Sequence, residues 1–119
     1  MRPETLAIHA GGEVDPATAA VAPPIHLSTT FRHGPDGASE HGYEYVRGEN
    51  PTLARLEAAL AALEGGAVAQ AYASGMAAID HVFALLPAGS HAILPTDYYP
   101  GVRALAREFL EPQGIRISM

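Results

Sequence analysis

The sequence predicts an α/β fold with a parallel sheet, and three observations lead to this class. From about residue 50 onward, short apolar segments of strand length alternate with segments of helical pattern. Glycine and proline separate these segments. The 119-residue chain is 48% hydrophobic, which is typical of a globular protein. Strands that alternate with helices indicate right-handed βαβ units.

The first fifty residues are expected to be an irregular arm. Glycine and proline pairs recur among polar clusters there, as at Gly11-Gly12, Pro23-Pro24 and Gly34-Pro35. A stretch of this length is too long for an ordinary loop, so we expect it to wrap around a domain or to lie on a partner. The predicted division is therefore an arm over 1–50 and the first βα units over 51–119.

The first regular element is a helix that begins at Pro51. Asn50 is a favourable N-cap, and proline suits the first helical position. Gly65-Gly66 provides the stop. Four leucines recur at helical spacing and predict one apolar face: Leu53, Leu56, Leu60 and Leu63.

The rest of the chain reads as strands and helices in turn. We expect strands over 67–73 and 91–94 and from residue 115, and helices over 76–86 and 101–110. The third strand is still running at Met119, and a parallel sheet usually has more than three strands. The sequence is therefore expected to be incomplete.

Ser74-Gly75-Met76, between the first strand and its helix, is a candidate phosphate site. A helix N-terminus offers unpaired backbone N–H groups and the positive end of the helix dipole. Gly75 would let the backbone approach a ligand closely. The alternative is that Ser74 is only the N-cap of an ordinary helix. The chain contains neither GxGxxG after a strand nor GxxxxGK[ST], which argues against dinucleotide and P-loop sites.

Two further segments carry candidate ligand-binding side chains. Tyr45 and Arg47 lie two positions apart, so in an extended segment both would face one anion. The alternative is that Arg47 pairs with a neighbouring carboxylate, Glu44 or Glu49. Tyr98 and Tyr99 follow the second strand at its carboxyl end, where open α/β sheets place ligands. They would either stack on a flat ring or cover the sheet.

Composition excludes several classes of function. The net charge of −6 without long acidic blocks argues against a nucleic-acid or anionic-membrane surface. No apolar run reaches the ~20 residues of a membrane span, and the start lacks a signal-peptide pattern, so we predict a cytoplasmic protein. The histidines do not fall at metal-ligand spacing, so no metal site is expected. All seven basic residues are arginine, so no lysine amine is present to form a Schiff base.

Taken in order, several motifs resemble the Cys/Met-metabolism family of pyridoxal-phosphate enzymes. That family includes cystathionine γ-synthase, cystathionine β- and γ-lyases, methionine γ-lyase and the homoserine-ester sulfhydrylases. The resemblance implies the fold type I, aspartate-aminotransferase-like large domain, of which 51–119 would be the start. The motifs are IHAG (8–11), PPIHLSTTF (23–31), YEYVRGENPT (43–52), LE…L..LEGG (56–66), ASGMAAI (73–79) and D.YYPG (97–101).

The resemblance also implies roles in binding pyridoxal 5'-phosphate. Ser74 and the N–H groups of Gly75 and Met76 would hold the cofactor phosphate. Tyr99 would stack on the pyridine ring and assist proton transfer. The family often has Tyr-Gly-Gly-Thr here, whereas this chain has Tyr99-Pro100-Gly101-Val102, so Tyr98 remains the alternative stacking residue.

The arm and the reaction follow from the same resemblance. Tyr45 and Arg47 would contact the phosphate of the neighbouring subunit's cofactor, with the arm crossing the interface of a homodimer or tetramer. The implied reaction is elimination or replacement at the β or γ carbon of a sulfur-containing or homoserine-ester amino acid. The family's Schiff-base lysine and its pyridinium-pairing aspartate come after Met119, as do a further phosphate-binding serine and the arginine for the substrate carboxylate. We therefore expect an N-terminal part that is inactive alone.

Two other interpretations stay open. The chain would be a short non-catalytic remnant that acts as an interaction module with full-length relatives, or a different phosphate-binding α/β protein. A module that stands alone should have a closed sheet edge and a polar finish. The sequence ends with the apolar run Ile117-Ser118-Met119 instead. This end favours part of a larger enzyme over both of these interpretations.

Overall fold

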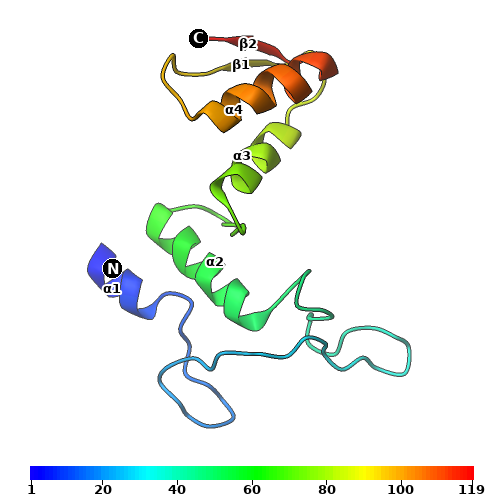
Figure 1. Cartoon of the computed structure of the whole chain (residues 1–119). Coiled ribbons are helices and arrows are strands. Elements are labelled where there is room, and N and C mark those ends of the chain that lie inside the picture. The colour runs from blue at the N-terminus through cyan, green and yellow to red at the C-terminus, as the bar shows by residue number, and fades with distance from the viewer. The chain divides into compact units, whose positions relative to one another are not determined.

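The computed structural model describes all 119 residues, which form two compact units. The first unit comprises residues 1–71 and the second residues 72–119. Figure 1 shows the elements in chain order, with the helices of the first unit in blue and green and the strands of the second in yellow and red.

The first unit contains two helices, α1 (Pro3–His9) and α2 (Pro51–Glu64). The sequence pattern did not predict α1, which lies inside the arm. Proline at its first position and Glu4 in its first turn both favour a helix start. α1 packs on α2. The turn after α1 needs Gly11, because its φ is +69° and a Cβ there would collide with the Arg55 carbonyl oxygen.

Helix α2 confirms the prediction at both ends. The Asn50 side-chain oxygen accepts a hydrogen bond from the Thr52 N–H at 2.8 Å, and Gly65 ends the helix with a φ of +67°. The predicted apolar face is not buried within this chain. Leu53, Leu56, Leu60 and Leu63 are each exposed, Leu56 to 50%. The side of α2 that faces the arm is the half-buried one, which includes Pro51, Ala54 and Arg55.

The remainder of the arm is irregular, as predicted, and hydrogen bonds hold it in place. Thr30 and Tyr45 form one isolated antiparallel bridge, and His33 and Ser39 form another. Between them Arg32 and Glu40 make an ion pair at 3.0 Å. The arm is thus an ordered path of chain with little regular secondary structure.

The expected strand over 67–73 is wrong, because the structure forms no strand in this segment. A strand exists only where its backbone groups pair with a neighbouring strand. Here the Ala71 N–H donates to the Glu57 carboxylate of α2 at 2.9 Å. The apolar run has the composition of a strand, but no strand pairs with it within this chain.

The second unit contains the predicted parallel pair. Strand β1 (His91–Ile93) pairs in parallel with β2 (Arg116–Ser118), with Ala92 opposite Ile117. The connection between them runs through α4 (Pro100–Leu105), which continues as a π-helical segment (Ala106–Leu110) and a 3₁₀ turn (Glu111–Gln113). This βαβ unit confirms the predicted parallel arrangement, and Figure 1 shows the helix lying along the strand pair.

Helix α3 (Gly75–Ala84) precedes this unit and shares its core. Met76 and Ile79 of α3 pack against this core, and so does Tyr98, which lies just before α4. The core therefore places the N-terminus of α3 near the start of α4. No helix of the structure is long and apolar enough to cross a membrane. The buried apolar core residues are Phe83, Val102, Ala106, Leu110 and Ile115.

Candidate functional site

The N-terminus of α3 presents two open backbone donors. Ser74 is the N-cap, and its hydroxyl oxygen accepts a hydrogen bond from the Ala77 N–H at 3.2 Å. Its carbonyl oxygen accepts from the Ala78 N–H, also at 3.2 Å. The N–H groups of Gly75 and Met76 have no partner within the chain. These two donors, together with the helix dipole, favour an anion at this point.

A cavity of about 400 Å³ lies directly at this helix start. We call it the α3 cavity, and it is lined by Ser74, Gly75, Met76, Ile79 and Tyr99. A Cβ built on Gly75 would meet no atom within 4 Å, so the space in front of this residue is open. The structure therefore brings together four of the residues singled out in the sequence, Ser74 to Met76 and Tyr99.

Tyr99 occupies this cavity because of a close approach at Gly101. A Cβ on Gly101 would lie 2.7 Å from Cε1 of the Tyr99 ring and 3.1 Å from Sδ of Met76. The ring thus lies over the Gly101 backbone and beside Met76. Tyr99 remains 65% exposed, so one part of the ring is free to contact a ligand.

Tyr98, the alternative stacking residue, is placed differently. Its half-buried side chain packs against the core of the second unit. The Arg103 guanidinium lies 5.2 Å from its ring centroid, and this contact holds the ring in place. Tyr98 does not line the α3 cavity. The geometry thus favours Tyr99 as the ring that would meet a flat ligand.

Tyr45 and Arg47 lie in the first unit and contact each other. The Arg47 guanidinium donates to the Tyr45 hydroxyl at 2.9 Å and lies 4.5 Å from the ring centroid. The alternative pairing of Arg47 with Glu44 or Glu49 is not formed, since the one ion pair of the chain joins Arg32 to Glu40. Arg47 is exposed and keeps free N–H groups for an acceptor. The two side chains therefore lie together, although Arg47 is in a turn and not in the extended segment that the prediction assumed.

The α3 cavity fits a phosphate-bearing aromatic cofactor. The unpartnered N–H groups of Gly75 and Met76 suit phosphate oxygens, and the absent Cβ of Gly75 lets such a group approach the backbone. Tyr99 supplies an aromatic surface in the same cavity, and Ile79 adds an apolar wall. The donor set is one of backbone amides and a hydroxyl, which matches a phosphate ester better than a metal ion.

Sequence reasoning missed two residues of this site, Gly101 and Ile79. Ile79 lines the cavity because it lies one turn after Gly75 on the same helix face. Gly101 determines where the Tyr99 ring lies. A Pro-Gly pair directly after a tyrosine is a usable signal, since proline fixes the helix start and glycine permits a close approach.

Comparison with known proteins identifies the family. The family model for the Cys/Met metabolism PLP-dependent enzymes matches residues 4–119. Cystathionine gamma-synthase of Mycobacterium tuberculosis is 52% identical over 100 residues, which is 83% of this chain and 26% of the relative. Cystathionine gamma-lyase of Homo sapiens is 44% identical over 115 residues, which is 96% of this chain and 28% of the relative.

A solved structure shows the same agreement in three dimensions. The apo methionine gamma lyase CalE6 of Micromonospora echinospora superposes with a TM-score of 0.84 and 36% identity. That match covers 99% of this chain and 31% of the lyase chain. The chain thus spans about a quarter to a third of the length of the proteins it matches. Its sequence and its backbone together show that the chain belongs to the Cys/Met metabolism family of PLP-dependent enzymes.

Proposed function

We propose that this chain forms the cofactor-phosphate site of a PLP-dependent enzyme of the cystathionine synthase and lyase type. The observation that carries the proposal is the α3 cavity, where two free backbone N–H groups and the Tyr99 ring face one space. The relatives act as cystathionine gamma-synthase and gamma-lyase by name, which supports this reaction class.

The polar and aromatic groups of the α3 cavity have distinct tasks. The N–H groups of Gly75 and Met76 bind phosphate oxygens, and the cap made by Ser74 keeps the helix start in the required shape. Tyr99 covers one face of the cofactor ring and excludes water from it. Its hydroxyl is the group that would hold a proton during transfer to or from the substrate. Bound pyridoxal phosphate supplies an electron sink for the amino-acid substrate.

The arm has a task in a second subunit. Tyr45 and Arg47 form a ready donor pair, and we propose that they contact the phosphate of the neighbouring subunit's cofactor in a homodimer or tetramer. The substrate would be a sulfur-containing or homoserine-ester amino acid that undergoes elimination or replacement at its β or γ carbon. The cytoplasmic location stays a prediction.

A charge placed at Gly75 tests the phosphate site. Gly75→Asp would direct a carboxylate into the phosphate position, while a new Cβ meets no atom within 4 Å and the helix gains an acidic residue in its first turn. We expect pyridoxal 5'-phosphate to bind at least about tenfold more weakly to this variant, a change of about 1.4 kcal/mol. Gly75→Asn has nearly the same shape without the charge and should lose much less affinity.

Calorimetric titration measures these affinities. Pyridoxal, which lacks the phosphate, is titrated as the comparison ligand. Wild type should prefer pyridoxal 5'-phosphate over pyridoxal, and Gly75→Asp should lose that preference. Equal binding of both ligands to the wild type would refute a phosphate site at α3. Equal loss in the Asp and Asn variants would show that shape and not charge is responsible.

We also propose that the 119-residue chain does not catalyse the reaction alone. It has no lysine, so no side-chain amine is available to link to the cofactor aldehyde. The purified chain, supplied with pyridoxal 5'-phosphate and cystathionine, should release neither ammonia nor thiol above the level of the cofactor alone. Turnover above that level contradicts the proposal.

A further inference from the structure

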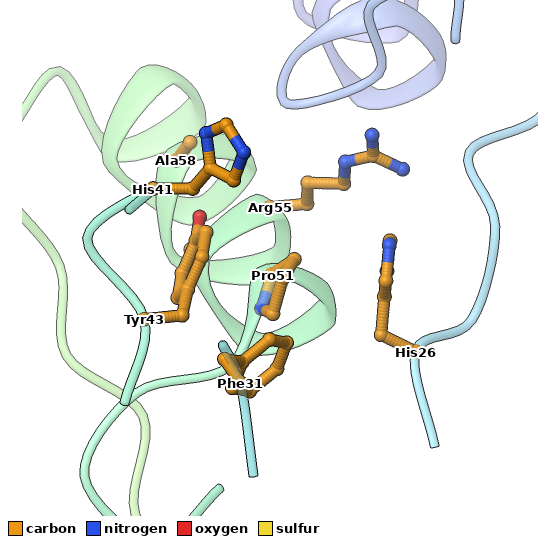
Figure 2. Close-up of a pocket in the computed structure, with 8 residues that line it drawn as sticks. His26, Phe31, His41, Tyr43, Pro51, Arg55 and Ala58 are labelled. Carbon is orange, nitrogen blue, oxygen red and sulfur yellow. The ribbon is translucent and has the colours of Figure 1, made fainter. Parts of the chain in front are cut away.

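A second cavity lies in the first unit and has no role in the site described above. We call it the α2 cavity. Its volume is about 490 Å³, and it opens between the arm and α2. Figure 2 shows Arg55 and His26 on one side of Pro51, and His41 and Tyr43 on the other. The lining residues are His26, Phe31, His41, Tyr43, Pro51, Ala54, Arg55 and Ala58.

Two nitrogen atoms of this cavity are buried without a hydrogen-bond partner. They are Nδ1 of His26 and Nη1 of Arg55. A guanidinium can only donate, so an acceptor is required to satisfy it. Buried polar groups are nearly always paired, because an unpaired one costs about 1–3 kcal/mol. Arg55 therefore needs an acceptor, and Nδ1 of His26 would take the same acceptor when this nitrogen carries the ring proton.

Hydrogen bonds hold the His26 backbone against the start of α2. The His26 N–H donates to the Thr52 hydroxyl oxygen at 2.9 Å, and its carbonyl oxygen accepts from the Asn50 side-chain amide at 3.3 Å. Both partners belong to the start of α2, which also carries Arg55. The backbones of His26 and Arg55 are therefore held to one helix, which limits how far the two side chains can separate.

The remaining lining is mostly apolar and partly aromatic. The rings of Phe31 and Tyr43 pack together with centroids 5.6 Å apart. Pro51, Ala54 and Ala58 cover the side of the cavity formed by α2. Such a surface gains free energy from contact with an apolar or aromatic body and not from contact with a bare inorganic ion.

No acidic side chain lines the α2 cavity, so its charge is that of Arg55 and of any protonated histidine. Asp15 is the acid that responds to Arg55, which contributes a minor part of the lowering of the Asp15 pKa. These two residues form no ion pair, and the Asp15 oxygens accept instead from Ala17 and Thr18. The Arg55 charge is thus available to an incoming anion.

We propose that the α2 cavity binds a small organic carboxylate with a flat apolar body. One carboxylate presents two acceptor oxygens, one for the Arg55 guanidinium and one for His26 with the ring proton on Nδ1. The apolar body would lie against Phe31 and Tyr43. The residues involved differ from those of the α3 cavity, so this binding and the proposed cofactor function can fail independently.

Benzoate is the probe for the first test. Titration of the full chain with benzoate, followed by NMR of the histidine and aromatic ring signals, should give saturable shifts at His26, Phe31 and Tyr43. Benzamide has the same body without the charge, and inorganic phosphate has charge without the body. Both should bind at least about tenfold more weakly than benzoate. A lack of saturable shifts overturns the proposal, and so does phosphate binding as tight as that of benzoate.

Three variants assign the binding to the named atoms. Arg55→Gln should weaken benzoate binding at least about tenfold. His26→Phe keeps the ring and removes its nitrogens, and it serves as the independent variant should the first not fold. Arg107→Gln removes the same charge from an exposed position in the second unit and should leave the affinity unchanged. Wild-type affinity in either of the first two variants, with the fold intact by amide spectra, overturns the proposal.

Discussion

The absence of a side chain at Gly101 permits the Tyr99 ring to lie where it does. The Cβ of an alanine there would stand 2.7 Å from Cε1 of that ring, a distance that real atoms do not tolerate. The ring is the movable partner, because Tyr99 is 65% exposed and the Gly101 backbone is fixed in α4. The geometry of the α3 cavity is thus controlled from outside the set of residues that would touch the cofactor.

We predict that Gly101→Ala lowers affinity for pyridoxal 5'-phosphate severalfold without lowering stability. The ring must move, whereas alanine favours a helix over glycine by about 0.5–1 kcal/mol. NMR signals of the Tyr99 ring and the urea unfolding midpoint measure the two effects. Gly75→Ala adds the same methyl group where no atom lies within 4 Å, so the Tyr99 signals should stay in place in this control. An unmoved Tyr99 ring in Gly101→Ala contradicts the prediction.

Asp15 gives a pH-dependent prediction. Hydrogen bonds from the Ala17 N–H at 2.9 Å and from the Thr18 hydroxyl at 3.0 Å favour the ionised carboxylate and lower the pKa of Asp15 below its ordinary value of 3.8. The associated stabilisation is therefore present above pH 3.8 and is lost as the pH falls through the lowered pKa.

The Asp15 carboxyl carbon signal, followed by NMR during an acid titration, checks this prediction. Thr18→Val removes the hydroxyl donor and should move the pKa part of the way back toward its ordinary value. The Ala17 N–H remains in this variant, so the shift should not vanish. A wild-type pKa at or above the ordinary value would contradict the assignment of these two hydrogen bonds.

At the scale of the elements, Asn50 connects α2 to the arm. Its oxygen caps α2 through the Thr52 N–H, while its amide nitrogen donates to the His26 carbonyl oxygen. We predict that Asn50→Ala costs about 0.5–2 kcal/mol of unfolding free energy for the cap alone, and more because the half-buried His26 carbonyl also loses its donor.

Asn50→Asp separates the two roles of this side chain. The aspartate keeps the capping oxygen but cannot donate to His26, so its loss should fall between that of the wild type and that of alanine. Urea unfolding followed by circular dichroism measures all three proteins. A variant Asn50→Asp as stable as the wild type would show that the bond to the arm contributes nothing.

Elements with strong local signals could be predicted from the sequence. Asn50-Pro51 and Gly65 mark both ends of α2, and Ser74 marks the start of α3, because caps and stops act within a few residues. The helix α1 was missed because Arg2 is no N-cap and the helix has only seven residues. The prediction of a strand over 67–73 was wrong, because a strand needs a partner strand and the local sequence does not indicate whether one is present.

The α3 cavity and the α2 cavity also differ in how far the sequence predicts them. Ser74 to Met76 and Tyr99 could be assigned to one site in advance only through the resemblance to the family, since the strand expected before Ser74 is not formed. The pairing of His26 with Arg55 spans 29 positions of irregular chain, and no spacing rule covers such a distance. Tertiary packing of the arm on α2 alone creates it.

At the scale of the whole molecule, apolar burial is concentrated in one unit. All five buried apolar residues lie between residues 72 and 119, whereas the only buried residue of the first unit is Asn50. The first unit therefore depends on hydrogen bonds, caps and a close helix contact for its order. The second unit has the packed core that supports the α3 cavity.

We predict that Phe83→Ala destabilises the second unit by about 3–5 kcal/mol, because it empties the middle of this small core. Such a loss is a large share of the ~5–15 kcal/mol that folded domains possess. Val82→Ala is the matched control on the same helix, since Val82 is 63% exposed and should change stability by less than about 0.5 kcal/mol. Amide hydrogen exchange over residues 75–118 measures both. Equal protection in the two variants would contradict the assigned core.

The pairing of β1 with only β2 has a practical consequence for handling the protein. In a two-stranded sheet, each strand leaves the backbone amide and carbonyl groups of its outer edge without a partner strand. Ile93 adds an exposed apolar side chain on β1. Open borders of this kind act as templates on which further chains add strand by strand into aggregates. The thioflavin fluorescence of concentrated solutions of this chain should therefore rise with time. Dilution, or blocking of these sheet edges, should slow the rise.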